Sequence, residues 1–128
     1  MDLDYTITSA KDFDATVQAV LDETAAANYR VLSVHDVSAT LAEKGFDRER
    51  VTIVELCNAK HAHAVLAADV RIGLMLPCPV MVYVEGDAVK IATMKPTLIA
   101  QFFPQADIGD VAAEVESSLK GIMERAAR

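Results

Sequence analysis

The stretch Glu55-Leu-Cys-Asn-Ala-Lys60 and the later run Gly73-Leu-Met-Leu-Pro-Cys-Pro79 decide how this chain is organised. The first stretch ends a predicted strand and begins a predicted helix, because Asn58 is a favourable N-cap residue. The second run leads into the next predicted strand. Together they contain both cysteines of the chain, Cys57 and Cys78. We therefore expect any functional site to lie where these two strands end and begin.

Outward from these stretches, the chain alternates between strand and helix patterns. β-Branched and aromatic residues predict strands over residues 5–8, 29–34, 50–57, 78–85 and 88–94. Helical spacing of apolar residues predicts long helices over 13–26 and from 107 or 110 through 123, and short ones over 38–45 and 59–68. Pro96 and Pro104 predict an irregular segment over 95–105. The apolar connector 69–77 has no clear pattern.

Short polar residues mark the predicted helix ends. Residues 9–12 resemble a capping box that begins at Ser9, with Asp12 where Glu or Gln is more usual. Ser38 is the expected cap of the short helix, and Asp107 or Asp110 that of the last helix. Gly45 should end the short helix, with Phe46 folding back onto it as a hydrophobic contact.

This order of elements predicts one α+β domain over residues 1–128. We expect an antiparallel sheet of about five strands, since short connections join neighbouring strands in that way. Two long helices should pack on one face of the sheet, and the shorter helices are additions to this plan.

The two central strands are apolar on both faces. Val51 and Ile53 point one way, while Val54 and Leu56 point the other. The strand over 78–85 repeats the pattern, with three valines opposite Met and Tyr. Strands of this kind need a covering layer on both faces of the sheet, and the predicted helices cover only one face. A homodimer is our first expectation for the other face, ahead of an apolar ligand in a monomer.

The chain has a net charge of −7, from 19 acidic residues and 12 Lys and Arg residues. This charge limits the classes of partner that the chain is expected to bind. Without a basic run we expect no nucleic-acid binding and no anionic membrane surface as a partner. The acidic start shows no signal-peptide pattern, and no apolar run approaches the ~20 residues of a membrane span. We therefore expect a cytoplasmic protein with reduced cysteines.

The central third of the chain resembles a known family. The run Glu55-Leu-Cys-Asn58, then Ala68-Asp69, the segment from Ile72 to Cys78 and the strand Val80-Met-Val-Tyr83 are similar to the domain-of-unknown-function family numbered 302. That resemblance implies a compact α+β fold like a half of the TATA-binding protein, in the order β-α-β-β-β-β-α with extra short helices. It also implies a frequent dimer and no assigned activity.

The chain departs from the family pattern next to the motif. Ala59 stands where the family usually has proline, and the nearby His61 and His63 are not part of the pattern. A metal site that used these histidines would therefore be particular to this chain.

Cys57 and Cys78 are the first candidates for chemistry. A helix N-terminus after Cys57 would favour its thiolate, and antiparallel pairing of the two strands would bring Cys78 close. A reducible disulfide or a two-thiolate metal site is one interpretation. With His61 the pair would form a three-ligand set for zinc or copper. The alternative is that both cysteines are small buried hydrophobes.

Three further residues complete the candidate site. Glu55 shares a strand face with Cys57, so it either acts as an acid or base of raised pKa or reaches solvent or a lysine. Asn58 is more simply an N-cap than a ligand-binding group, and Pro77 more simply shapes the strand edge. His63 should face away from the site.

No catalytic triad, paired carboxylates or nucleotide-binding fingerprint is present, so the sequence assigns no reaction and no cofactor. We interpret the chain as a non-catalytic binding module for a small apolar ligand or a partner protein, acting as a homodimer. The groove would be lined by the 72–76 connector and the uncovered sheet face. The alternatives are a thiol-redox or sulfur-handling protein or a metal-binding protein that uses Cys57 and Cys78, and a purely structural dimer.

Overall fold

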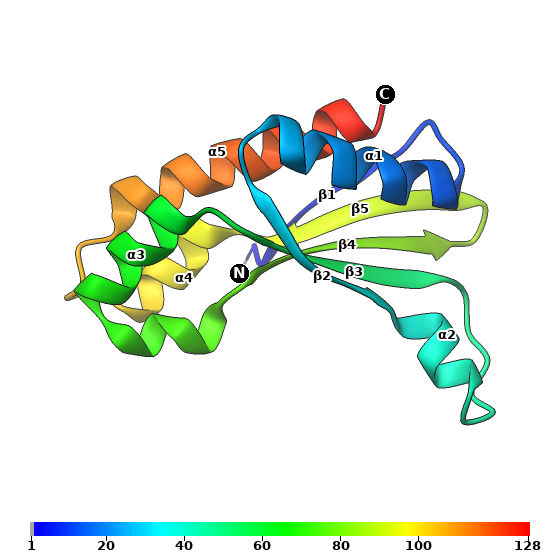
Figure 1. Cartoon of the computed structure of the whole chain (residues 1–128), viewed down its shortest axis with the longest axis horizontal. Helices are drawn as coiled ribbons and strands as arrows, with labels where there is room; N and C mark the ends of the chain where they lie inside the picture. The colour runs from blue at the N-terminus through cyan, green and yellow to red at the C-terminus, as the bar shows by residue number, and fades with distance from the viewer. Residues whose placement is uncertain (1) are drawn as a thin grey trace.

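A computed structural model describes residues 2–128, which form an α+β fold with one open antiparallel sheet (Figure 1). The strand order across the sheet is β1-β5-β4-β3-β2. The strands are β1 (Asp4–Thr8), β2 (Arg30–Asp36), β3 (Val51–Cys57), β4 (Cys78–Glu85) and β5 (Ala88–Met94). All neighbouring pairs are antiparallel, as the short connections predicted.

The two long helices, α1 (Phe13–Ala26) and α5 (Gly109–Ala126), lie across one face of the sheet (Figure 1). A short helix, α2 (Val37–Ala42), lies on an arm between β2 and β3 that extends away from the body. The remaining short elements gather beyond one end of the sheet: α3 (Ala59–Ala68), the 3-10 helix η1 (Val70–Met75) and α4 (Pro96–Phe102). The predicted fold class is therefore confirmed.

The main core fills the space between the sheet and these two helices. Alternate side chains of the central strands, such as Val54 and Val80, are fully buried there and face Leu119 and Ile122 of α5. A smaller cluster of Val65, Ile72 and Ile108 lies at the end of the molecule where α3, η1 and α5 meet. The second cluster carries the cavity that is described below.

The opposite face of the sheet carries an apolar row. Ile53 pairs with Met81, and Met81 pairs with Ala92, so three adjacent strands place these side chains side by side. They line a shallow depression whose walls come from β1, β3, β4 and β5 together with Leu3. The sequence-based prediction of central strands that are apolar on both faces is confirmed.

The prediction of an irregular segment over 95–105 is wrong, because α4 begins at Pro96. Proline occupies the first helical position, where its missing N–H has no partner to lose and its fixed φ suits a helix. Pro104 then follows the end of α4. Likewise, the connector 69–77 contains η1, which Asp69 starts by accepting a hydrogen bond from the Arg71 N–H at 2.9 Å.

Several predicted caps are displaced by a few residues. Asp12 itself caps α1 and accepts from the Ala15 N–H at 2.8 Å, whereas Ser9 hydrogen-bonds the Thr16 hydroxyl. Asp36, not Ser38, caps α2. Helix α5 starts without a side-chain cap, so the expectation for Asp107 and Asp110 is wrong. Asp107 instead takes a left-handed conformation, with φ of 53°.

At the end of α2, the predicted helix stop at Gly45 is present, but the predicted packing of the Phe46 side chain is not. Gly45 has φ of 84°, and the Phe46 N–H bonds the Leu41 carbonyl, as expected for a helix stop. The Phe46 side chain is nevertheless 67% exposed, because α2 has no buried residue to receive it. The predicted hydrophobic contact is therefore absent.

In the part of the chain that the structure describes, no helix is both long enough and apolar enough to cross a membrane.

Candidate functional site

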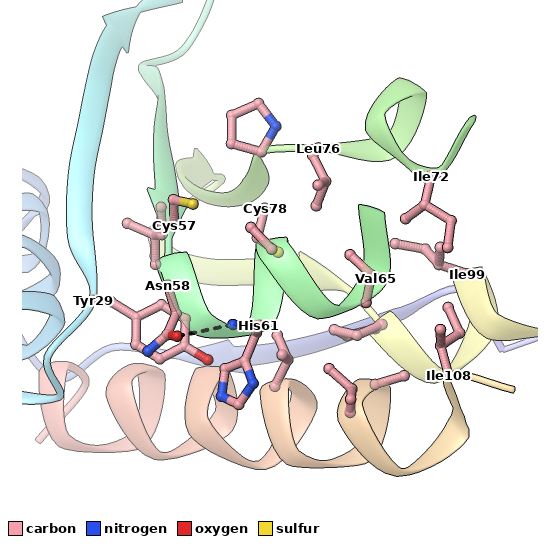
Figure 2. Close-up of a pocket in the computed structure, with 17 residues that line it drawn as sticks. Tyr29, Cys57, Asn58, His61, Val65, Ile72, Leu76, Cys78, Ile99 and Ile108 are labelled. Carbon is pink, nitrogen blue, oxygen red and sulfur yellow. Dashed lines mark hydrogen bonds between the residues drawn. The ribbon is translucent and has the colours of Figure 1, made fainter. Parts of the chain in front are cut away.

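A cavity of about 60 Å³ lies where β3 ends and β4 begins (Figure 2). Helices α3, η1, α4 and α5 close it on the other sides. We call it the end cavity, and its walls are Tyr29, Leu56, Cys57, Asn58, His61, Ala62, Val65, Ile72, Leu76, Pro77, Cys78, Pro96, Ile99, Ile108, Val111, Ala112 and Val115. Five of the six site residues that the sequence predicted, all but Glu55, are among them.

The start of α3 positions one wall of the cavity. The Asn58 Oδ1 atom accepts a hydrogen bond from the His61 backbone N–H at 3.2 Å, which caps the helix as predicted. Because side chains four residues apart lie on one helix face, His61 and Val65 both turn toward the cavity. His63 is exposed, as its offset of two residues predicted.

Tyr29 lines the cavity, and its hydroxyl is buried without a hydrogen-bond partner. It follows Asn28, whose φ of 63° ends α1 and turns the chain into β2. The residue is 7% exposed, and its ring centroid lies 6.5 Å from that of His61. Among the side chains that the structure describes, its hydroxyl is the one buried polar atom without a hydrogen-bond partner.

The surroundings of Tyr29 keep its phenol protonated. Burial raises the pKa of the hydroxyl, and nearby Cys78 and Glu114 raise it further. Ser118 acts in the opposite direction, which places its hydroxyl near that of Tyr29, but the two groups do not meet the geometry of a hydrogen bond. The Tyr29 phenol therefore keeps its proton at neutral pH.

Cys57 and Cys78 both line the end cavity but are not bonded to each other. In the sheet, Cys78 pairs with Leu56, so Cys57 leaves the backbone on the other side of β3. Burial raises the pKa of the Cys78 thiol to about 11, and Cys57 adds to the shift. Cys78 is thus a thiol rather than a thiolate at neutral pH, which is the state of a packed hydrophobe.

The three-ligand metal set is not formed. His61 is mostly buried, and its Nε2 atom lies 3.8 Å from Glu114 Oε1 on α5. Across residues 2–128, no three His, Cys, Asp or Glu side chains are grouped so that they could hold a metal ion. The interpretation that joined Cys57, Cys78 and His61 around zinc or copper therefore finds no support in this arrangement and stays a prediction.

Glu55 lies outside the end cavity. Its Oε1 atom is 2.6 Å from His35 Nε2 on the neighbouring strand, on the open face of the sheet. The sequence suggested that Glu55 would reach solvent or a lysine, whereas its partner is a histidine. His35 pairs with Ile53, two positions from Glu55, so the β2–β3 register brings the two polar side chains diagonally together.

Pro77 lines the end cavity beside Cys78, and the peptide bond that precedes it is cis. The connector contributes Ile72 and Leu76 to the same wall, as expected. The uncovered sheet face does not take part, because its depression has a separate set of walls. The single groove predicted from both features is therefore two distinct sites.

Comparison with known proteins agrees with the fold described above. The sequence matches the family described as "Domain of unknown function DUF302" over residues 5–126. The chain belongs to the DUF302 family. A crystal structure of an uncharacterized conserved DUF302 protein from Bacillus stearothermophilus has a TM-score of 0.91 and 28% sequence identity, and the match covers 98% of each chain. None of the curated proteins matches this sequence.

The family motif of this DUF302 chain surrounds the end cavity. The Leu56-to-Asn58 part of the motif and the segment from Leu76 to Cys78 form its walls, while Ala59 replaces the usual proline without interrupting α3. The motif therefore builds the end of the sheet at which the cavity lies.

Sequence reasoning missed the walls that come from distant elements. The unrecognised residues are Tyr29, Ala62, Val65, Pro96, Ile99, Ile108, Val111, Ala112 and Val115. For α5, the amphipathic stripe was visible, but nothing in it separates residues that face the sheet from residues that face α3. For Tyr29, the available signal was its position directly after a helix stop.

Proposed function

We propose that this DUF302 chain is a non-catalytic binding module that takes a small, mainly apolar ligand in the end cavity. Support comes from the cavity wall, where aliphatic side chains such as Val65, Ile72 and Ile99 predominate. Small-molecule sites commonly combine such walls with a few polar groups that fix orientation. Here the polar side chains are few, and apart from the two cysteines they are Tyr29, Asn58 and His61.

The size of the end cavity limits the ligand. A buried water requires roughly 10–15 Å³ of cavity volume, and a cavity of about 150 Å³ binds benzene or xenon. At about 60 Å³, the end cavity has room for a few water molecules or an organic group smaller than benzene. A larger ligand would place only one end there, between the half-buried residues Cys57, Leu76 and Pro77 at its rim.

Thiol-redox or sulfur-handling chemistry at Cys57 and Cys78 is the less supported alternative. Such chemistry needs a thiolate, and the raised pKa of Cys78 opposes one. The arrangement of the two residues on opposite sides of β3 also gives no direct route to a disulfide. A binding function therefore fits the properties of the cavity residues better than a redox function does.

The binding proposal is tested with xenon as an apolar probe and methyl NMR as the readout. We expect saturable shifts at the methyl groups of Val65, Ile72 and Ile99, which face the cavity. Ala112→Leu should fill the cavity and abolish these shifts. Ala113→Leu is the matched control, since this neighbouring residue of α5 is exposed. Unchanged xenon shifts in Ala112→Leu, or shifts confined to other regions, would refute the proposal.

We also propose that two copies of the chain associate through the open face of the sheet. The apolar row Ile53, Met81 and Ala92 supports this, because no helix lines the depression that these residues form in the described part of the chain. A second copy would cover this depression and the half-buried side chains of Ile53 and Met81. This association leaves the end cavity free, so ligand binding and dimerisation are independent proposals.

A further inference from the structure

The open face of the sheet carries a histidine–carboxylate pair beside its apolar row. The His35 Nε2 atom on β2 lies 2.6 Å from Glu55 Oε1 on the neighbouring strand β3, and the two side chains are 51% and 29% exposed (Figure 1). His35 pairs with Ile53 of the row, and Glu55 pairs with Pro79 at the wall of the depression. A partner that covers the apolar row therefore meets this pair.

An interface of ordinary size would enclose the pair. The sheet has five strands, and neighbouring strands lie about 4.8 Å apart, so the four intervals give a width of about 19 Å. A standard interface buries about 800 Å² on each partner, and a round patch of that area is about 30 Å across. A second copy centred on Met81 would therefore cover the open face from edge to edge, including Glu55, which lies two positions from Ile53 on β3.

Removal of water makes the charge of this pair decisive. An ionised Glu55 beside a neutral His35 would place one uncompensated carboxylate per chain in the interface, which is costly. A protonated His35 compensates that charge across the 2.6 Å contact. In a single chain, water solvates both partly exposed side chains, so the proton matters much less. Association of two chains therefore favours the protonated pair.

The neighbours of His35 identify it as the group that responds to pH. Histidine is the side chain that ordinarily changes charge between pH 5 and 8. Two of the three histidines belong to α3, which leaves His35 on the sheet. Asp36 pairs with Thr52 on the helix side of the sheet and caps α2. The other charged residues that the strands place on the open face are Asp4, Arg30, Glu85 and Lys90, of which the last two form an ion pair at 3.0 Å.

We propose that the His35–Glu55 pair makes the association of two chains depend on pH, with each chain taking up one proton as the dimer forms. This regulation rests on the proposed dimer through the open face. A fall in pH shifts an equilibrium toward the state that binds more protons. The dimer is therefore strengthened as the pH falls from 8 to 6.

Sedimentation equilibrium at pH 8, 7 and 6 measures the dissociation constant of the dimer. The wild-type constant should fall by more than about tenfold from pH 8 to pH 6. His35→Gln removes the titrating ring, so its constant should vary much less. In Glu55→Gln, a protonated His35 would be an unpaired charge in the interface. Association of Glu55→Gln should therefore weaken in acid, which reverses the wild-type dependence.

The control and the outcomes separate this regulation from the dimer itself. His63→Gln should keep the wild-type dependence, because this exposed residue lies on α3, beyond the end of the sheet (Figure 1). If wild-type chains associate equally at the three pH values, or if His35→Gln keeps the full dependence, the regulation is overturned and the dimer proposal stands. If wild-type chains stay single at every pH and concentration, both proposals fail.

Discussion

The state of a single thiol decides how Cys78 behaves. Its pKa of about 11 results chiefly from burial at the start of β4. Nucleophilic and redox reactions of cysteine proceed through the thiolate, so a raised pKa suppresses them. The presence of Cys78 in the family motif is thus better explained by its volume and polarisability than by its reactivity.

We expect Cys78 to react slowly with iodoacetamide in the native protein. At pH 8, a pKa of about 11 leaves roughly one thiolate in a thousand, against about one in ten for an ordinary cysteine. Ionisation alone then slows alkylation about a hundredfold relative to denatured protein. Peptide mass spectrometry after timed labelling measures the rate. Equal rates in native and denatured protein would contradict the raised pKa and favour the thiol alternative.

The same residue should make stability depend on alkaline pH. The folded chain holds the Cys78 proton more tightly than the unfolded chain, whose thiol has its ordinary pKa of 9.0. As pH rises from about 9 to about 11, the unfolded state loses this proton first, so the free energy of unfolding falls. The loss should reach about 2 kcal/mol at most.

Urea denaturation across this pH range measures the effect. Cys78→Ala provides the comparison, because it removes the thiol while other groups, including Tyr29 with its raised pKa, continue to titrate. The wild-type slope should exceed the variant slope between pH 9 and 11. Parallel curves would show that Cys78 does not carry the dependence.

At the scale of elements, α4 is attached to α5 through one carboxylate. Glu116 accepts hydrogen bonds from the Thr97 hydroxyl at 2.7 Å and from the Thr97 N–H at 3.3 Å. Burial alone would raise the pKa of Glu116, but these bonds and Lys120 lower it below its ordinary value. The ionised carboxylate therefore stabilises the folded state, and α4 forms one wall of the end cavity.

Thr97→Val should reduce stability by about 1 kcal/mol at neutral pH through loss of the hydroxyl donor. Folding lowers the pKa of Glu116. The stabilisation from its carboxylate is therefore present above the pKa of Glu116 in the unfolded chain, and it is lost as the pH falls through the pKa of Glu116 in the folded chain. The difference between variant and wild type should therefore shrink in acid. Thermal unfolding at several pH values measures it, with Thr97→Ser as the control that keeps a hydroxyl. An equal loss in Thr97→Ser would point to packing instead.

Elements with strong local signals were predictable from the sequence. Helix α3 has the predicted bounds because Asn58 caps it, and the β4–β5 hairpin turns at Gly86, which has φ of 62°. Predictions failed where the same residue type has two roles. Pro96 was interpreted as a helix breaker although it starts α4, and Asp107 as a cap although it occupies a left-handed turn.

The candidate site was only half predictable. Cys57, Asn58, Pro77 and Cys78 are near each other in sequence or through one strand pair, so their meeting could be inferred. Walls such as Ile99 and Val115 meet them only because α4 and α5 pack around the end of the sheet. Register and helix orientation set those contacts, and a single sequence does not encode either of them locally.

At the scale of the whole molecule, the sheet is covered on one face only. The apolar row across β3, β4 and β5 gives the chain a second apolar surface, on which Ile53 and Met81 are half-buried. Met81 lies in the middle of this row, between Ile53 and Ala92.

Met81→Glu should prevent association of two chains by placing a charge at the centre of that surface. If the proposed dimer forms through the open face, wild-type protein should show twice the mass of one chain, and the variant should weaken association by more than about tenfold. Light scattering during size-exclusion chromatography measures both. Ser117→Glu, on the exposed side of α5, is the matched control. A single-chain mass for wild type at all concentrations would refute the dimer.

The pairing of β1 with β5 has a consequence for how the protein is made. Asp4 pairs with Met94, and α1 packs against α5, so these segments await partners that are synthesised much later. Until then, α1 has no helix beside it and β1 has no neighbouring strand. Contacts between such distant segments also slow folding. The sheet is therefore completed only once β5 has been made, and its helical layer only after synthesis has passed α5.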